Sequence, residues 1–324
     1  MSRPRISVVV PTFRRPELLR RCLVALCTQD LDPGDYEIVV ADDGPSPETA
    51  RAVADLDGLP GSPRVRCLPV RHTQGPAGAR NVGWRAATAP LIAFTDDDTI
   101  PDPGWLPTGL EALDSGADAA VGRTIVPAPQ PPTDYERGVA GLERAEFITA
   151  NCFVSRRALE RVGGFDERYE RAWREDSDLQ FALMDHGFVI ASAPAAIVVH
   201  PIRPAPWGVS LSQQRQVMYD ALLYRKYPGH YRRRIRAAPP IDYYVAVIAF
   251  AAGVAALFGG RPWIAAAGFA TWTVLTLALF HRRLRGASRA PRHVLEMLVT
   301  SAFIPPLALY WRAVGSARYR VLFA

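Results

Sequence analysis

Two long apolar stretches near the end of the chain place the strongest constraint on its fold. Residues 243–260 and 262–280 contain no charged side chain, and each is close to the ~20 residues that a helix needs to cross a bilayer. The glycine-rich turn between them predicts a helical hairpin. Their high content of Ala and Gly suits close packing of membrane helices. The alternative is a pair of buried helices in a soluble domain.

A third apolar stretch, residues 294–311, is less clear-cut. It contains Glu296 and is interrupted by Pro305 and Pro306. The sequence therefore leaves three alternatives for it: a further span, a re-entrant segment, or a helix lying in the membrane interface.

Arginines gather on both sides of the predicted hairpin, in segments 232–236 and 282–285, and the formal net charge is +6. We interpret both clusters as juxtamembrane charge rather than as a nucleic-acid surface, so no nucleic-acid partner is expected. By the positive-inside rule, both ends of the hairpin face the cytoplasm. We therefore expect a multi-pass protein of the cytoplasmic membrane whose preceding domain is also cytoplasmic.

The chain before the hairpin alternates short apolar runs with helical patterns. Strands are predicted at 6–10, 36–41, 65–70, 91–94, 119–126, 147–154 and 196–199, and helices at 17–29, 47–56, 77–87, 105–113, 156–162, 176–186 and 209–227. Such alternation indicates an α/β fold with a mostly parallel sheet. We predict three parts: an α/β domain at 1–205, a linker helix with a basic segment at 206–240, and an all-α membrane region at 241–324.

Acidic clusters follow two of the predicted strands. Asp42 and Asp43 end the second strand, and Asp96, Asp97 and Asp98 end the fourth. Ligands of open parallel sheets bind beyond the carboxyl ends of the strands, so both clusters are expected at one binding edge. Oxygen ligands of this kind suit Mg²⁺ or Mn²⁺. A solvated acidic loop is the alternative for each cluster.

Two further segments carry candidate binding chemistry. Glycines at 75 and 78 would let a ligand approach the backbone, with Arg80 facing a phosphate or carboxylate. Glu175 and Asp176 open a predicted helix, where acids are favourable on dipole grounds alone. The alternative to such helix capping is that this pair contains a general base.

Taken in order, these motifs resemble glycosyltransferase family 2, whose members have the GT-A fold. The resemblance covers about residues 5–200 and rests on six segments of this sequence: Ser7 to Arg14, Asp42-Asp43-Gly44, Gly78-Ala79-Arg80-Asn81, Asp96-Asp97-Asp98, Gly163-Gly164-Phe165-Asp166-Glu167 and Glu175-Asp176. It implies an enzyme that transfers a sugar from a nucleotide-activated donor.

The resemblance also implies where the donor binds. The residues that would surround it are Pro11, Thr12, Arg14, Asp42, Asp43, Gly78, Arg80, Asn81 and Asp97. Asp43, or its neighbour Asp42, would hold the base, as the matching acid of the family does for uracil. A UDP-sugar is therefore the favoured donor.

The resemblance assigns the metal and the base as well. Asp96 and Asp98 would be the ends of the D-x-D motif, with Asp98 favoured as the direct ligand of Mg²⁺ or Mn²⁺. His200 resembles the histidine that some members use as a further ligand, and a plain strand-end histidine is the alternative. Asp176 would be the catalytic base, with Glu175 beside it near the acceptor. One base in a single displacement implies inversion at the anomeric carbon.

One departure from the family concerns processivity. Processive members carry Q-x-x-R-W after the base, whereas residues 213–216 read Gln-Gln-Arg-Gln. We therefore predict transfer of one sugar per encounter, to a glycan or lipid-linked acceptor. Two alternatives stay open: a membrane nucleotidyltransferase, and a membrane module that binds sugar nucleotides without turnover. The α/β domain contains no lysine to contact a triphosphate, which disfavours the nucleotidyltransferase.

Overall fold

The computed structural model describes residues 3–323. Met1 and Ser2, from the part predicted at 1–205, and Ala324, from the part predicted at 241–324, lie outside the described residues. The chain forms two compact units, one made of Met1–Pro127 with Ala140–Ile202 and the other of Ala128–Val139 with Arg203–Ala324. The short segment Ala128–Val139 thus leaves the first unit and belongs to the second. The finer division of the second unit into a linker and a membrane region stays a prediction.

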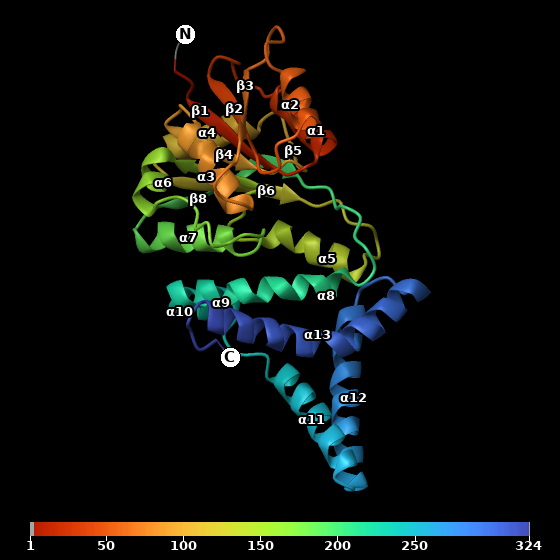
Figure 1. Ribbon diagram of the computed structural model, residues 1–324. Helices are drawn as coiled ribbons and strands as arrows, with labels where there is room; N and C mark the ends of the chain where they lie inside the picture. The colour runs from red at the N-terminus through yellow and green to blue at the C-terminus, as the bar shows by residue number, and fades with distance from the viewer. Residues whose placement is uncertain (1–2, 324) are drawn as a thin grey trace. The chain divides into compact units, whose positions relative to one another are not determined.

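The first unit contains one curled sheet (Figure 1). Its strands are β1 (Ile6–Thr12), β2 (Tyr36–Asp42), β3 (Arg64–Pro69), β4 (Leu91–Thr95), β5 (Ile100–Pro101), β6 (Ala119–Ile125), β7 (Asn151–Ser155) and β8 (Ile190–Val199), in the order β3-β2-β1-β4-β7-β6-β8-β5. The first four strands in that order are parallel, and β6 is parallel to β8, while β7 and β5 run antiparallel to their neighbours. The predicted α/β fold with a mostly parallel sheet is confirmed.

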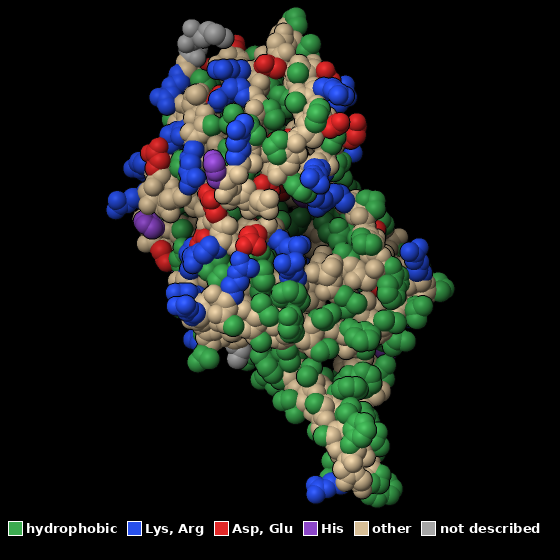
Figure 2. Space-filling view, in the orientation of Figure 1, with side chains coloured by type: hydrophobic (Ala, Val, Ile, Leu, Met, Phe, Trp, Pro, Cys, Tyr) green, Lys and Arg blue, Asp and Glu red, His purple; other side chains and the backbone are tan. Residues whose placement is uncertain are grey.

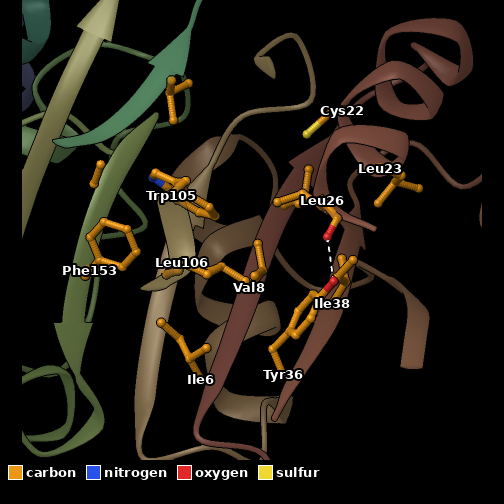
Figure 3. Close-up of a cluster of buried hydrophobic side chains, with 14 of the residues drawn as sticks. Ile6, Val8, Cys22, Leu23, Leu26, Tyr36, Ile38, Trp105, Leu106 and Phe153 are labelled. Atoms are coloured by element: carbon orange, nitrogen blue, oxygen red, sulfur yellow. Dashed lines mark hydrogen bonds between the residues drawn. The ribbon is translucent and has the colours of Figure 1, made fainter. Parts of the chain in front are cut away.

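Helices cover this sheet. They are α1 (Pro16–Leu26), α2 (Pro47–Ala54), α3 (Pro76–Ala86), α4 (Trp105–Asp114), the 3-10 turn Gly141–Arg144, α6 (Arg156–Val162) and α7 (Glu175–Asp185). Figure 3 shows a hydrophobic core cluster, in which Val8 and Ile38 of the sheet lie beside Leu23 and Leu26 of α1. The Tyr36 hydroxyl donates to the Leu26 carbonyl at 2.9 Å, so the rim of this core is also tied by a hydrogen bond.

Three sequence predictions in this unit need correction. The strand predicted at 147–154 begins only at Asn151, because the amide of Asn151 donates to the Ile148 carbonyl and closes a turn. Strand β8 begins at Ile190, six residues earlier than predicted, and its partly exposed first half hides the apolar signal. The two-residue strand β5 is too short to have left a pattern.

A buried carboxylate joins β2 to the strand and helix ends beside it. Glu37 accepts hydrogen bonds from Ser7 Oγ at 2.7 Å and from the Thr88 amide at 2.6 Å, and it pairs with Arg66 at 3.0 Å. Burial alone would raise the pKa of Glu37, but the hydrogen bonds from Thr88 and Ser7 and the charge of Arg66 outweigh it and lower the pKa. The ionised form therefore stabilises the fold.

Replacing Glu37 by Gln should lower the free energy of unfolding by about 2–3 kcal/mol near neutral pH, since it leaves the half-buried Arg66 without its charge partner. A lowered pKa gives stability that is present above the unfolded-state pKa and is lost as the pH falls through the folded-state pKa. The difference from wild type, measured by denaturant unfolding in detergent, should therefore shrink in acid. Exposed Glu111→Gln is the matched control, and equal stability of both variants would contradict the argument.

The second unit is helical. Its elements are α5 (Asp134–Ala140, at the border of the units), α8 (Val209–Gln213), the 3-10 turn Gln214–Gln216, α9 (Val217–Lys226), α10 (Pro228–His230), the π-helical turn Tyr231–Ile235, α11 (Ile241–Phe258), α12 (Pro262–Leu284) and α13 (Pro291–Arg318). Helices α11, α12 and α13 are each long and apolar enough to cross a membrane. The proline-rich stretch at residues 127–133 is followed by the short helix α5.

Helices α11 and α12 form the predicted hairpin. Glycines let their backbones approach closely: a Cβ on Gly268 would lie 2.6 Å from the Ala249 carbonyl oxygen. At the open end of the hairpin, Arg282 pairs with Asp242 at 3.3 Å, which places both ends together. Apolar side chains cover the hairpin surface in Figure 2, and Phe258 and Trp263 are each 87% exposed. Such exposure is typical of helices solvated by lipid.

Candidate active site

Two aspartates and a histidine gather beyond the end of β4. Asp96 and Asp98 lie in the turn after this strand, which is closed by the amide and hydroxyl of Thr99 donating to the Asp96 carbonyl. His200 follows β8, where its amide donates to the Ile125 carbonyl at 2.8 Å. One ligand atom from each of the three side chains lies within 4.8 Å of the others. The predicted metal ligands are therefore neighbours in the fold.

The donor atoms of this cluster fit a divalent cation. Asp98 and His200 are buried, and Nε2 of His200 lies 3.7 Å from Oδ1 of Asp98. Nδ1 of His200 is buried and has no hydrogen-bond partner among residues 3–323. Because a buried polar atom without a partner is costly, a ligand to this imidazole is expected. Two carboxylates and one imidazole are suitable ligands for a divalent ion such as Mn²⁺.

Asp97 points away from this cluster. It accepts a hydrogen bond from Thr12 Oγ1 at 2.8 Å and pairs with Arg15 at 3.3 Å. Burial raises the pKa of Asp97 to about 6, although the hydrogen bond from Thr12 opposes this. Asp97 therefore ties the end of β1 to the acidic turn. Sequence patterns did not predict the contact with Arg15, because it joins residues 82 positions apart.

Arg80 links the acidic turn to the second acidic pair. It lies in α3 with its side chain buried, and it pairs with Asp96 at 2.6 Å and with Glu175 at 3.2 Å. Its guanidinium also lies over the ring of Phe165, 5.7 Å from the centroid. We expected Arg80 to face a phosphate or a carboxylate, and in the structure its partners are two carboxylates of the protein itself. One buried cation thus holds the acids that follow β4 beside those that open α7.

Glu175 and Asp176 form the first turn of α7. Arg174 before them has a left-handed backbone, and the Ser177 amide donates to Oδ1 of Asp176 at 2.7 Å. Burial, together with the neighbouring Asp176, raises the pKa of Glu175 to about 7, although the charge of Arg80 opposes this. Burial also raises the pKa of Asp176. Raised pKa values are what a proton acceptor working near neutral pH requires.

The two acids at the end of β2, Asp42 and Asp43, differ in their hydrogen bonds. Its Oδ2 accepts from the Gly75 amide at 2.7 Å, whereas its Oδ1 is buried without a hydrogen-bond partner among residues 3–323. Asp42 is buried and accepts from the Gly44 amide at 3.0 Å, as in a local turn. Burial raises the pKa of Asp43. This geometry favours Asp43 over Asp42 as the residue that would hold a base.

The remaining predicted donor residues fall into two groups. Pro11 and Thr12 are buried at the end of β1, and the exposed Arg14 lies over the ring of Phe13 at 5.3 Å. These three lie at the strand end nearest the acidic turn, to which Thr12 bonds directly.

Gly78 and Asn81, by contrast, serve packing. A Cβ on Gly78 would meet Thr73 Oγ1 at 2.3 Å. The Asn81 side chain donates to the Phe165 carbonyl and accepts from the Phe165 amide and from Trp84. Both residues therefore fasten α3 to neighbouring loops, and their contacts are with protein.

Comparison with known proteins bears on this arrangement. The model of "Glycosyl transferase family 2" matches residues 7–163, and that of "Glycosyl transferase family group 2" matches residues 91–313, more than half of the chain. The chain belongs to glycosyltransferase family 2. The predicted family and enzyme class are thereby confirmed, and the nucleotidyltransferase and the non-catalytic module lose their support.

Individual relatives agree with this assignment. Glycosyltransferase AglE of Haloferax volcanii is 27% identical over 224 residues, which are 66% of this chain and 72% of the relative. A Campylobacter jejuni GalNAc(5)-diNAcBac-PP-undecaprenol β-1,3-glucosyltransferase is 32% identical over 47% of this chain and 48% of the relative. Validoxylamine A glucosyltransferase of Streptomyces hygroscopicus subsp. limoneus matches 65% of this chain, which spans about half (52%) of that relative.

A solved structure shows the same fold. The mannosyltransferase PcManGT from Pyrobaculum calidifontis, in complex with GDP-Man and Mn²⁺, superimposes with a TM-score of 0.53 at 19% identity, covering 99% of this chain and 88% of that one. The GT-A fold predicted for the first unit is therefore confirmed. GDP-Man and Mn²⁺ are ligands of PcManGT, and the similarity to it concerns the fold.

Proposed function

We propose that this glycosyltransferase moves one sugar from a nucleoside diphosphate to an acceptor hydroxyl, with a divalent cation and with inversion. The observation that carries the proposal is the arrangement around Arg80. This buried cation holds Asp96, beside the candidate metal ligands Asp98 and His200, in the same cluster as the base candidates Glu175 and Asp176. A leaving diphosphate and an attacking hydroxyl need those two functions side by side.

The residues divide the chemistry between them. Asp176 accepts the proton of the acceptor hydroxyl as that hydroxyl attacks the anomeric carbon, and Glu175 beside it helps to orient the acceptor. Asp96, Asp98 and His200 would hold Mn²⁺ or Mg²⁺, which supplies Lewis-acid stabilisation of the charge on the leaving nucleoside diphosphate. A single attack with one base inverts the anomeric configuration.

The donor proposal concerns the base. The buried free oxygen of Asp43 can accept the imide N–H of uracil, and the hydrogen bond from Gly75 keeps the carboxylate oriented for it. We therefore favour a UDP-sugar. The guanine of a GDP-sugar also offers N–H donors, so competition between UDP and GDP for binding is the measurement that decides the base.

For the acceptor, we propose a glycan or saccharide linked to a membrane lipid, handled at the cytoplasmic face. Three helices can cross a membrane, and one relative is named for an undecaprenol-linked substrate. The arginines at 232–236 and 282–285 support a cytoplasmic orientation of both hairpin ends. The absence of Q-x-x-R-W supports one transfer per encounter rather than polymer extrusion.

Product analysis tests the reaction. The full-length protein in detergent or nanodiscs is incubated with UDP-sugars and a membrane lipid extract, with Mn²⁺, with Mg²⁺, or with chelator. We expect free UDP and a glycosylated lipid in equal amounts, and no turnover with chelator. Pyrophosphate as the product, or equal turnover in chelator, would contradict the reaction. Turnover on soluble saccharides with none on lipid-linked ones would contradict only the acceptor.

The role of His200 makes a separate prediction. Replacing His200 by Asn should weaken Mn²⁺ binding at least about 10-fold, because the cluster loses its imidazole ligand. Titration of the protein with Mn²⁺ alone, followed by electron paramagnetic resonance of the free ion, measures this affinity. The exposed His186→Asn at the end of α7 is the matched control. Unchanged affinity would mean that His200 is only a strand-end residue.

A further inference from the structure

Helix α13 has two faces of unusual character. Its exposed face is apolar along most of the helix, with Leu295, Leu298, Phe303 and Tyr310 between 43% and 58% exposed. Pro306 and Ala313 continue the same exposed stripe at helical spacing. The buried face is mixed: it contains apolar residues such as Met297 and Ile304, and it also carries the polar residues His293, Thr300, Ser301 and Arg312. A water-soluble amphipathic helix would instead expose its polar residues.

The polar face is fastened to the rest of the second unit by specific contacts. Arg283, at the end of α12, donates to Thr300 Oγ1 at 2.6 Å and to Ser301 Oγ at 3.2 Å. Nε2 of His293 accepts from the Asp134 amide at 3.0 Å. His293, Thr300 and Ser301 therefore have hydrogen-bond partners inside the unit, and the apolar face of α13 is its outer surface.

Close packing fixes the C-terminal half of α13 as well. A Cβ on Gly315 would lie 2.6 Å from the Met218 carbonyl oxygen of α9. The Arg312 guanidinium lies 4.0 Å from the ring centroid of Phe323. Helix α13 thus packs along α8 and α9, and it also contacts α11 and α12.

The direction of α13 within this unit limits how it can meet a membrane. Figure 1 shows α13 running beside α8 and α9 and across the hairpin of α11 and α12. At 1.5 Å per residue, α11 and α12 are about 27 and 34 Å long, close to the ~30 Å thickness of the hydrocarbon layer, and both fall within the range of about 17–25 residues typical of spanning helices. When the hairpin crosses the bilayer, a helix that runs across the hairpin lies along the bilayer surface.

We propose that α13 is an in-plane membrane helix whose stripe of Leu295, Leu298, Phe303 and Tyr310 contacts the lipid at the boundary between headgroups and acyl chains. The occupant of this face is the bilayer that α11 and α12 already cross, because the apolar surface continues from the hairpin. The exposed Arg292 and Arg318 near its two ends meet the headgroups. Only α11 and α12 cross the bilayer, and residue 322 lies on the same side as residue 241. This inference is independent of the proposed reaction.

Labelling of single cysteines with a membrane-impermeant maleimide tests the topology in the full-length protein. Leu322→Cys, Arg261→Cys and Leu59→Cys are compared in sealed vesicles of both orientations, in a background with the four native cysteines replaced. We expect Leu322→Cys, a 96% exposed position, to be labelled with Leu59→Cys and not with Arg261→Cys. Labelling together with Arg261→Cys would overturn the proposal. If the background fails to fold, a C-terminal fluorescent or phosphatase fusion of the unaltered chain gives the same answer.

Depth measurements separate an in-plane helix from a re-entrant one. Spin labels at positions 295, 303 and 310 should all report a similar shallow depth, about 5–10 Å below the headgroups. A crossing helix would separate positions 295 and 310 by about 22 Å in depth. A re-entrant segment would place position 303 deepest of the three. Either gradient would overturn the proposal.

Discussion

Replacing Asp176 by Asn should reduce sugar transfer by about 10²–10⁴-fold while leaving donor binding nearly unchanged. The amide has the shape of the carboxylate and can still accept the hydrogen bond from Ser177, so α7 keeps its first turn. It cannot accept the proton of the attacking hydroxyl. The loss therefore falls on kcat rather than on the affinity for the nucleotide sugar.

The measurement pairs initial rates with the thermal stabilisation that the donor and Mn²⁺ produce, since a ligand that binds the native state raises its stability. Asp185→Asn, at the exposed end of the same helix, is the matched control and should keep the wild-type rate. A variant at position 176 that retained wild-type kcat would exclude Asp176 as the base. Glu175 would then be the remaining candidate in α7.

The same carboxyl pair predicts the pH dependence of the wild-type enzyme. Burial raises the pKa of both Glu175, to about 7, and Asp176. At low pH the pair holds protons and cannot accept another, so the rate should rise with pH and level off above neutrality. An ordinary solvated aspartate would give a plateau already above about pH 5.

The sequence predicted the first unit well because its signals are local. Apolar runs that end at Asp42 and at Asp96 predict strands whose carboxyl ends share one edge of the sheet. In the structure both acidic turns lie at this edge. Asp96, Asp98 and His200 were predicted as metal ligands from motif order, and they lie together. That assignment came from the resemblance to the family, whereas sheet topology predicted only that the two acidic turns share one edge.

Local sequence patterns did not predict which side chains would contact one another. Arg80 was expected to face a phosphate or a carboxylate, but the sequence could not identify its two partners, which are carboxylates 16 and 95 positions away. Asn81, the next residue, forms hydrogen bonds through its side chain with the backbone of Phe165. Which of two adjacent polar residues faces the site depends on the rotation of α3 against the sheet, and periodicity does not encode that rotation.

The membrane region shows a second limit. Hydropathy identified α11, α12 and α13 because each is long and apolar. Hydropathy averages over all sides of a helix. It therefore could not show that the polar residues of α13 lie on the side that packs against the second unit. Residues 128–139 belong to the second unit, and Asp134 of this segment pairs with Arg283 at 2.9 Å. A proline-rich stretch gives no hint of such a long-range partner.

Replacing Arg80 by Met should have the largest combined effect on the site. It removes a buried cation between Asp96 and Glu175 and leaves the buried Glu175 and the partly exposed Asp96 without a counter-charge, which should cost about 3 kcal/mol of stability. The charge of Arg80 lowers the pKa of both Glu175 and Asp176. Without it their pKa values rise further, so the acid limb of the rate profile should move to higher pH by about one unit or more.

The direction of the pH shift separates a role in positioning from a merely structural one. Arg80→Lys keeps a positive charge in the cluster, so the pH dependence of its rate should stay near that of wild type. Its kcat should still fall, because a single ammonium group replaces the guanidinium that pairs with both Asp96 and Glu175. Arg85→Met, on the exposed side of the same helix, should alter neither the pH dependence of the rate nor kcat. Mn²⁺ affinity of Arg80→Met should be retained or increased, since Asp96 loses a competing cation. A fall in kcat with an unmoved pH midpoint and weakened Mn²⁺ binding would show that Arg80 only supports the fold.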